Sequence, residues 1–129
     1  MSSTGTFGTA INCIDGRTQK AVTAWVREEA GVDYVDMVTE AGCDGVLHAA
    51  ADTALIASLK KKVGISVNAH KSSIIVVAGH HDCAENPISK EEHAAHIKES
   101  VALVRSWGFA VKVIVGVWVN DRWEVERVC

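Results

Sequence analysis

The sequence lacks a basic excess, a long apolar run and a recognisable secretory signal. Its 129 residues carry 13 Lys and Arg against 16 Asp and Glu, a net charge of −3, whereas nucleic-acid-binding surfaces are normally basic. No apolar run reaches the length of a membrane-spanning helix. Residues 1–9 are rich in Ser, Thr and Gly and have neither the charged nor the apolar region of a signal peptide. We therefore expect a cytoplasmic protein with no nucleic-acid or membrane partner.

Proline and linker-like stretches are also scarce. Pro87 is the only proline, and no internal repeat divides the chain. A chain of this length can bury a hydrophobic core without disulfide bonds, so we expect residues 1–129 to form a single domain. In a cytosolic chain its four cysteines are more typical of metal ligands or buried apolar thiols than of disulfides, although the sequence leaves a disulfide pair open.

Short β-rich runs alternate with longer helical stretches, which predicts an α/β fold with a mostly parallel sheet flanked by helices. The expected parallel strands are 7–14, 33–39, 73–78 and 110–119, the expected helices are 18–30, 44–63 and 89–107, and 64–71 stays unassigned. A turn at Asn120 and Asp121 leads into 123–128 as an antiparallel edge strand. The expected order is 2-1-3-4, with this fifth strand at the edge.

The residues best suited to chemistry lie at the ends of two of these strands. Cys13 and Asp15 lie at the end of the first expected strand, and His80 and Cys83 lie just past the end of the third. Ligands of parallel sheets bind beyond the carboxyl ends of the strands, so neighbouring strands bring these side chains to one edge. Two thiolates and an imidazole suit Zn²⁺, and three protein ligands leave a fourth position for water, as in catalytic zinc sites.

The segments 13–17 (Cys-Ile-Asp-Gly-Arg) and 79–83 (Gly-His-His-Asp-Cys) resemble two motifs of the β-class carbonic anhydrases. That family carries Cys-x-Asp-x-Arg after its first strand and His-x-x-Cys after its third. The resemblance implies an enzyme that hydrates CO₂ reversibly to bicarbonate by zinc-bound hydroxide, and at least a homodimer. It makes Cys13, His80 and Cys83 the zinc ligands. Asp15 then orients the bound water, or binds zinc itself in a closed form, and Arg17 holds Asp15 away from the metal.

Two departures from the family pattern keep other functions open. Ala84 stands where the family usually has glycine, and Thr39-Glu40-Ala41-Gly42 stands where it has Arg-Asn-Ala-Gly. The second stretch helps to shape the substrate pocket in that family. The alternatives are a zinc hydrolase for carbonyl sulfide or carbon disulfide, and a zinc-binding protein without turnover that acts through assembly or sensing.

The remaining histidines, cysteines and tryptophans have weaker signals. His81 is either a proton shuttle or an exposed loop residue. His93 and His96 lie three apart on a helix, a spacing that suits a metal but is more typical of surface histidines. Cys43 and Cys129 are expected to be structural or incidental rather than metal ligands. The tryptophans near the C-terminus are expected to pack in the core or at an interface: Trp107, Trp118 and Trp123.

Overall fold

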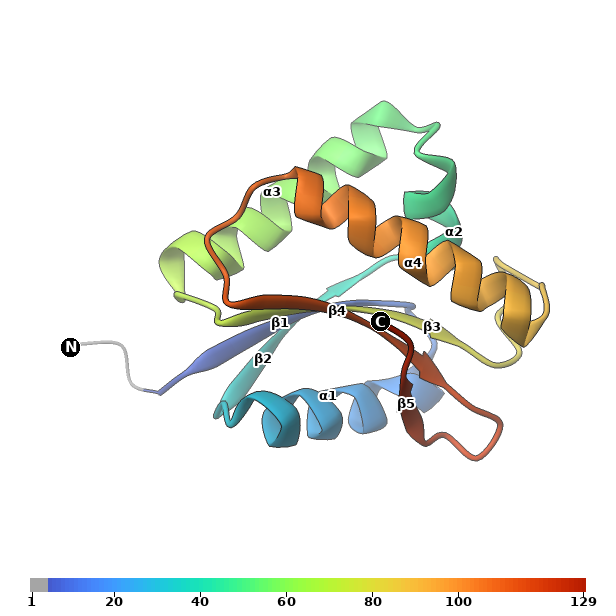
Figure 1. The fold of residues 1–129 in the computed structure, drawn as a ribbon, viewed down its shortest axis with the longest axis horizontal. Coiled ribbons are helices and arrows are strands. Elements are labelled where there is room, and N and C mark those ends of the chain that lie inside the picture. The colour runs from blue at the N-terminus through green and yellow to red at the C-terminus, as the bar shows by residue number, and fades with distance from the viewer. Residues whose placement is uncertain (1–4) are drawn as a thin grey trace.

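A computed structural model of the chain describes residues 5–129 as a five-stranded sheet with helices on both faces (Figure 1). The elements are β1 (Phe7–Asn12), α1 (Gly16–Ala30), β2 (Tyr34–Thr39), α2 (Cys43–Ala49), α3 (Thr53–Ala69), β3 (Ile74–His80), α4 (Lys90–Ser106), β4 (Val113–Val119) and β5 (Val125–Arg127). The sheet order is β2-β1-β3-β4-β5; the first four strands are parallel and β5 is antiparallel. The predicted fold class and strand order are confirmed.

Two apolar layers hold the helices to the sheet. Helices α2, α3 and α4 cover one face, and α1 covers the other (Figure 1). Because successive strand residues point to opposite faces, Ile75 and Val77 pack on the α3 and α4 side, whereas Val76 and Ala78 pack against α1. All seven residues of β3 are buried. The run of branched residues at 74–77 therefore correctly predicted a central strand covered on both faces.

The expected helix at 44–63 is wrong in its boundaries, since two helices occupy this region. Helix α2 ends at Ala49, and the next residue, Ala50, adopts a left-handed conformation with φ 49°. Helix α3 starts anew because the Asp52 side chain caps it, accepting a hydrogen bond from the Leu55 N–H at 3.0 Å. Helix α3 then continues to Ala69, so most of the unassigned segment 64–71 is helical. The continuous Ala-rich pattern conceals this break.

The C-terminal strands are shorter than expected. Strand β4 begins at Val113, after residues 107–112 have crossed from α4, and β5 covers only Val125–Arg127. The expected tight turn at Asn120 is part of a loop over residues 120–124. The Asn120 Oδ1 atom accepts hydrogen bonds from the N–H groups of Arg122 at 2.9 Å and Glu124 at 3.0 Å. This loop holds Trp123 at φ 59°, in the left-handed region.

Helix α4 begins as its sequence predicted. Ser89 Oγ accepts a hydrogen bond from the Glu92 N–H at 3.1 Å, and Glu92 Oε1 accepts one from the Ser89 N–H at 3.3 Å. This capping box satisfies two free backbone donors and confirms the predicted start of the helix. Across residues 5–129, every helix is too short or too polar to cross a bilayer.

Candidate metal centre

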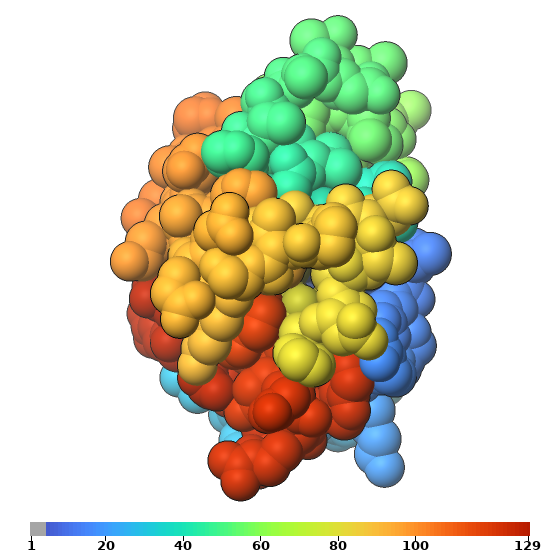
Figure 2. All heavy atoms as spheres, turned by 90° about the vertical axis from the view of Figure 1, so that its right-hand side faces the viewer, coloured from blue at the N-terminus to red at the C-terminus, as the bar shows by residue number. Residues whose placement is uncertain are grey.

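The candidate site lies where the carboxyl ends of β1 and β3 meet. The two strands are parallel neighbours, with Thr9 opposite Ile75 and Ile11 opposite Val77. Cys13 directly follows β1, and His80 is the last residue of β3, whereas the sequence placed it just past the end of that strand. Figure 2 shows that the segment after β3 (yellow), the β4–β5 loop (red) and the start of α1 (blue) adjoin on this face. Three distant parts of the chain therefore converge here.

The structure brings the three predicted ligands into one buried group. The donor atoms of Cys13, His80 and Cys83 all lie within 4.8 Å of one another, and each residue is buried. Around a tetrahedral zinc ion, bonds of about 2.0–2.3 Å place ligand atoms roughly 3.5–4 Å apart. A small contraction of the group would meet that geometry. The donor set of two sulfurs and one nitrogen also suits zinc chemically.

The His80 ring has one nitrogen free for a metal. Its Nδ1 atom lies 2.7 Å from the backbone carbonyl oxygen of His81. A carbonyl can only accept, so Nδ1 carries the proton and Nε2 keeps its lone pair. Nε2 is buried and makes no hydrogen bond within residues 5–129. An unpartnered buried nitrogen is costly, and a metal ion beside the two sulfurs would satisfy it.

Backbone geometry supports the two thiols. The Gly42 N–H group donates to Cys13 Sγ at 3.4 Å, which holds that sulfur in place. Gly42 has φ 61°, and a Cβ atom there would lie 3.0 Å from the Cβ of Glu85, so glycine is required. Burial and the neighbouring Cys13 raise the pKa of the Cys83 thiol to about 11. Without a cation Cys83 therefore holds its proton at pH 7, and binding a divalent cation releases it.

Asp15 and Arg17 form a bidentate ion pair beside the donor group. Asp15 caps α1 by accepting the Arg17 backbone N–H at 2.9 Å. The Arg17 guanidinium donates from Nη2 to Asp15 Oδ2 at 2.7 Å and from Nε to Oδ1 at 3.0 Å. These hydrogen bonds lower the pKa of Asp15 to about 2, so the carboxylate is ionised at any physiological pH. It is engaged by Arg17 and does not belong to the three-donor group.

Two residues to which the sequence assigned no site role complete the surroundings of Arg17. Asp82 accepts from Arg17 Nη1 through Oδ2 at 3.3 Å and from Nη2 through its backbone oxygen at 3.2 Å. The Arg17 Cζ atom lies 4.4 Å from the centre of the Trp123 ring. Asp82 could have been considered from its place inside the His-x-x-Cys motif. Trp123 lies forty residues further along the chain, and no local pattern connects it with the site.

Of the histidines outside the donor group, His93 differs from the expected surface position. His93 is buried, not exposed, because its face of α4 packs on α2, and its Nδ1 atom lies 2.5 Å from Asp44 Oδ2. His96 instead stacks on His48, with ring centres 3.8 Å apart, so His93 and His96 contact different groups. His81 is exposed.

The two remaining cysteines lie outside the donor group. Cys43 is buried and donates from Sγ to the Ala78 carbonyl oxygen at 3.1 Å, and burial raises the pKa of its thiol well above the usual value. Cys129 is half-buried and packs against the core on the α3 and α4 side.

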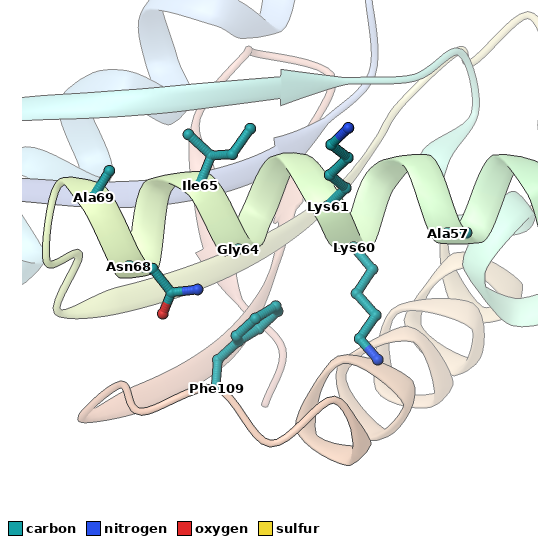
Figure 3. Close-up of a pocket in the computed structure, with 8 residues that line it drawn as sticks. All are labelled: Ala57, Lys60, Lys61, Gly64, Ile65, Asn68, Ala69 and Phe109. Carbon is teal, nitrogen blue, oxygen red and sulfur yellow. The ribbon is translucent and has the colours of Figure 1, made fainter.

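A separate surface cavity of about 590 Å³ lies along α3 (Figure 3). Phe109, from the segment between α4 and β4, packs over Gly64, where an added Cβ atom would lie 3.3 Å from the ring. The other lining residues are Ala57, Lys60, Lys61, Ile65, Asn68 and Ala69. None of them belongs to the donor group or contacts Arg17, so this cavity is not part of the candidate metal centre.

Comparisons with known proteins agree with this architecture. The family model described as "Putative carbonic anhydrase" matches residues 3–129. No curated protein matches the chain. A carbonic anhydrase from Streptococcus mutans is similar in structure, with a TM-score of 0.61 at 20% identity, covering 94% of this chain and 81% of that one.

Two further solved structures share the fold. One of two tetrameric β-carbonic anhydrases from Sordaria macrospora has a TM-score of 0.57 at 12% identity, covering 92% of this chain and 78% of that one. The apo form of a carbon disulfide hydrolase has a TM-score of 0.50 at 12% identity, covering 92% and 76%. At these identities the likeness concerns the fold alone.

Proposed function

Since this chain belongs to the "Putative carbonic anhydrase" family, we propose that it is a zinc enzyme that hydrates CO₂ reversibly to bicarbonate and a proton. The observation that carries the proposal is the buried, unpartnered Nε2 atom of His80 beside the sulfurs of Cys13 and Cys83. Zinc held there supplies a Lewis acid that lowers the pKa of a coordinated water towards about 7.

The protein's own groups hold and orient the reacting species. The His81 carbonyl oxygen keeps the proton on Nδ1 of His80, so Nε2 stays available to the metal. The ionised Asp15 carboxylate accepts a hydrogen bond from the attacking water and orients it. Arg17 engages both Asp15 oxygens, which keeps the carboxylate off the metal. A freed Asp15 would compete for the fourth position, because carboxylate oxygen is itself a good zinc ligand.

The broader setting is part of the same proposal. We expect residues 1–129 to act as one domain in the cytoplasm, and the substrate pair to be CO₂ and bicarbonate. We also expect a homodimer or a higher homo-oligomer. The tetrameric proteins of Sordaria macrospora with the same fold support an assembled state.

Metal analysis and a hydration assay test the proposal. The purified protein should contain about one zinc ion per chain and should accelerate CO₂ hydration in stopped-flow measurements. Cys83→Ser should lose most of the zinc, because a hydroxyl is a much weaker ligand than a thiolate. Cys43→Ser is the matched control: it replaces another buried thiol, outside the donor group, and should keep the metal. Equal zinc content in the two variants would contradict the assigned ligands.

A second candidate is hydrolysis of carbon disulfide or carbonyl sulfide by the same site. The shared fold with a carbon disulfide hydrolase and the altered stretch Thr39–Gly42 support this second candidate function. The test is sulfide release from either substrate by the zinc-loaded protein. Sulfide release without CO₂ hydration would favour this function. Bound zinc with neither reaction would favour a zinc-binding protein without turnover.

A further inference from the structure

The guanidinium of Arg17 has more partners than its pairing with Asp15 alone, although its side chain is 47% exposed. Its edge donates to Asp15 and also to the Asp82 side chain and backbone. Its Cζ atom lies over the Trp123 ring, 4.4 Å from the ring centre, which is cation–π distance. These partners come from three different segments: the start of α1, the loop after β3 and the β4–β5 loop.

Trp123 reaches this position at a conformational cost. Its φ of 59° lies in the left-handed region, which is rare for a bulky side chain. The loop maintains this backbone through a hydrogen bond from the Trp123 N–H to the Asn120 carbonyl oxygen at 3.0 Å and through the Asn120 side chain. The indole also packs against the apolar layer that includes α1, and its ring centre lies 6.5 Å from that of His80. Such strain persists where the surroundings over-determine a conformation.

We infer that Trp123 is a positioning residue, which clamps Arg17 against Asp15 and so keeps that carboxylate away from the metal's open position. This inference rests on the proposed zinc site and extends it with a residue from the far end of the chain. The indole face blocks one side of the guanidinium, while Asp82 restrains its outer edge. Without the ring, Arg17 can rotate into solvent, and Asp15 loses the partner that holds it.

Because residue 123 has a left-handed backbone, a glycine there removes the indole ring without straining the loop. Trp123→Gly removes the ring, and glycine adopts φ 59° without strain, so the loop should keep its fold. Trp123→Phe retains an aromatic face at the same position. Trp107→Phe, at the end of α4, changes a half-buried tryptophan that does not contact Arg17 and controls for general effects.

The test uses Co²⁺-loaded protein titrated with azide, followed by visible absorption. Azide needs the open position, so Trp123→Gly should weaken its binding at least ten-fold, Trp123→Phe by much less, and Trp107→Phe not at all. In an Asp15→Asn background, Trp123→Gly should change azide binding less than two-fold, because no carboxylate competes. Equal azide affinity in the parent and Trp123→Gly, or a full loss that persists in the Asp15→Asn background, would overturn the inference.

A second readout needs no metal. In the metal-free protein, the Arg17 Nε–H signal in ¹⁵N NMR should be protected from solvent exchange in the parent and in Trp123→Phe, and lose at least ten-fold protection in Trp123→Gly. Unchanged protection would also overturn the inference. Failure of the proposed function looks different: the azide and NMR results hold while the parent fails to hydrate CO₂.

Discussion

Two carboxylates of this protein each pair with a basic side chain, but in opposite surroundings. Asp15 and Arg17 lie at the protein surface, with side chains 20% and 47% exposed. Asp44 and His93 lie in the core between α2 and α4, with side chains 2% and 1% exposed. An exposed pair contributes little to stability, whereas loss of one partner from a buried pair is strongly destabilising. The same kind of pair therefore borders the candidate site in one place and belongs to the core in the other.

The buried pair is also connected to the candidate metal centre through Asn86. Asp44 Oδ1 accepts a hydrogen bond from Asn86 Nδ2 at 3.0 Å, and Asn86 lies three residues after Cys83. Ser100 Oγ, from α4, donates to the Asp44 carbonyl oxygen at 3.0 Å. Asp44 thereby ties α2 and α4 to the loop that carries Cys83. The exposed pair orients a carboxylate, while the buried pair anchors one of the proposed ligands.

The largest effect on stability should follow from Asp44→Ala. This change leaves the His93 ring and the Asn86 amide buried without their shared acceptor. Since each unsatisfied buried group costs about 1–3 kcal/mol, the free energy of unfolding should fall by about 3–5 kcal/mol. Urea unfolding at pH 7 measures it. Asp44→Asn keeps an oxygen acceptor for the His93 ring and should lower the free energy of unfolding clearly less than Asp44→Ala. A loss below about 1 kcal/mol in Asp44→Ala would remove the contrast between the two pairs.

Arg17→Ala should reduce activity strongly and stability only slightly, in contrast to Asp44→Ala. CO₂ hydration should fall at least about 100-fold, equivalent to about 2.7 kcal/mol of transition-state stabilisation, because the freed Asp15 competes for the metal. The free energy of unfolding should fall by less than about 1 kcal/mol, and zinc content should persist. The matched control is Arg27→Ala, an exposed arginine on the same helix, which should hydrate at the parental rate. Full activity in Arg17→Ala would refute the roles assigned to Asp15 and Arg17.

Asn86→Ala tests the connection between the buried pair and the metal centre. Loss of the hydrogen bond to buried Asp44 should lower the free energy of unfolding by about 1–2 kcal/mol. It should also loosen the Cys83 loop, so zinc should pass faster to a chelator. Ser100→Ala removes another hydrogen bond to Asp44 of similar strength but lies on α4, away from that loop. It should destabilise the protein without faster zinc loss. Equal rates in the two variants would contradict the connection.

The smallest expected effect on stability concerns His96, which lies beside Asn86, a partner of the buried Asp44. Burial, followed by the neighbouring His48, lowers the pKa of His96 below its usual value of 6.5. The folded state therefore favours neutral His96, so this residue's contribution is fully present above about pH 6.5 and declines as the pH falls below it. His96→Gln should flatten the fall in stability between pH 7.5 and 5 by a few tenths of a kcal/mol. An unchanged pH profile in urea unfolding would contradict this.

The regular parts of the fold could be predicted because their signals are local. The branched run at 74–77, the Ser89 and Glu92 cap and the alternation of strands and helices were sufficient for the α/β class and for placing β3 and α4 in the chain. The break at Ala50 was missed because alanine favours helix on both sides of it, and the Asp52 cap decides where α3 begins. Element type follows from composition, whereas boundaries depend on individual caps and turns.

The candidate site divides in the same way. Motif spacing and strand order by themselves determined that Cys13, His80 and Cys83 would meet, because parallel strands end at a common edge. Only the tertiary structure decided that Trp123 covers Arg17, and that His93 is buried on Asp44 instead of facing solvent. These contacts join residues 49 to 106 positions apart and arise from how a loop folds and which helix face packs inward. No sequence periodicity encodes that choice, since it depends on the shape of the surfaces that meet.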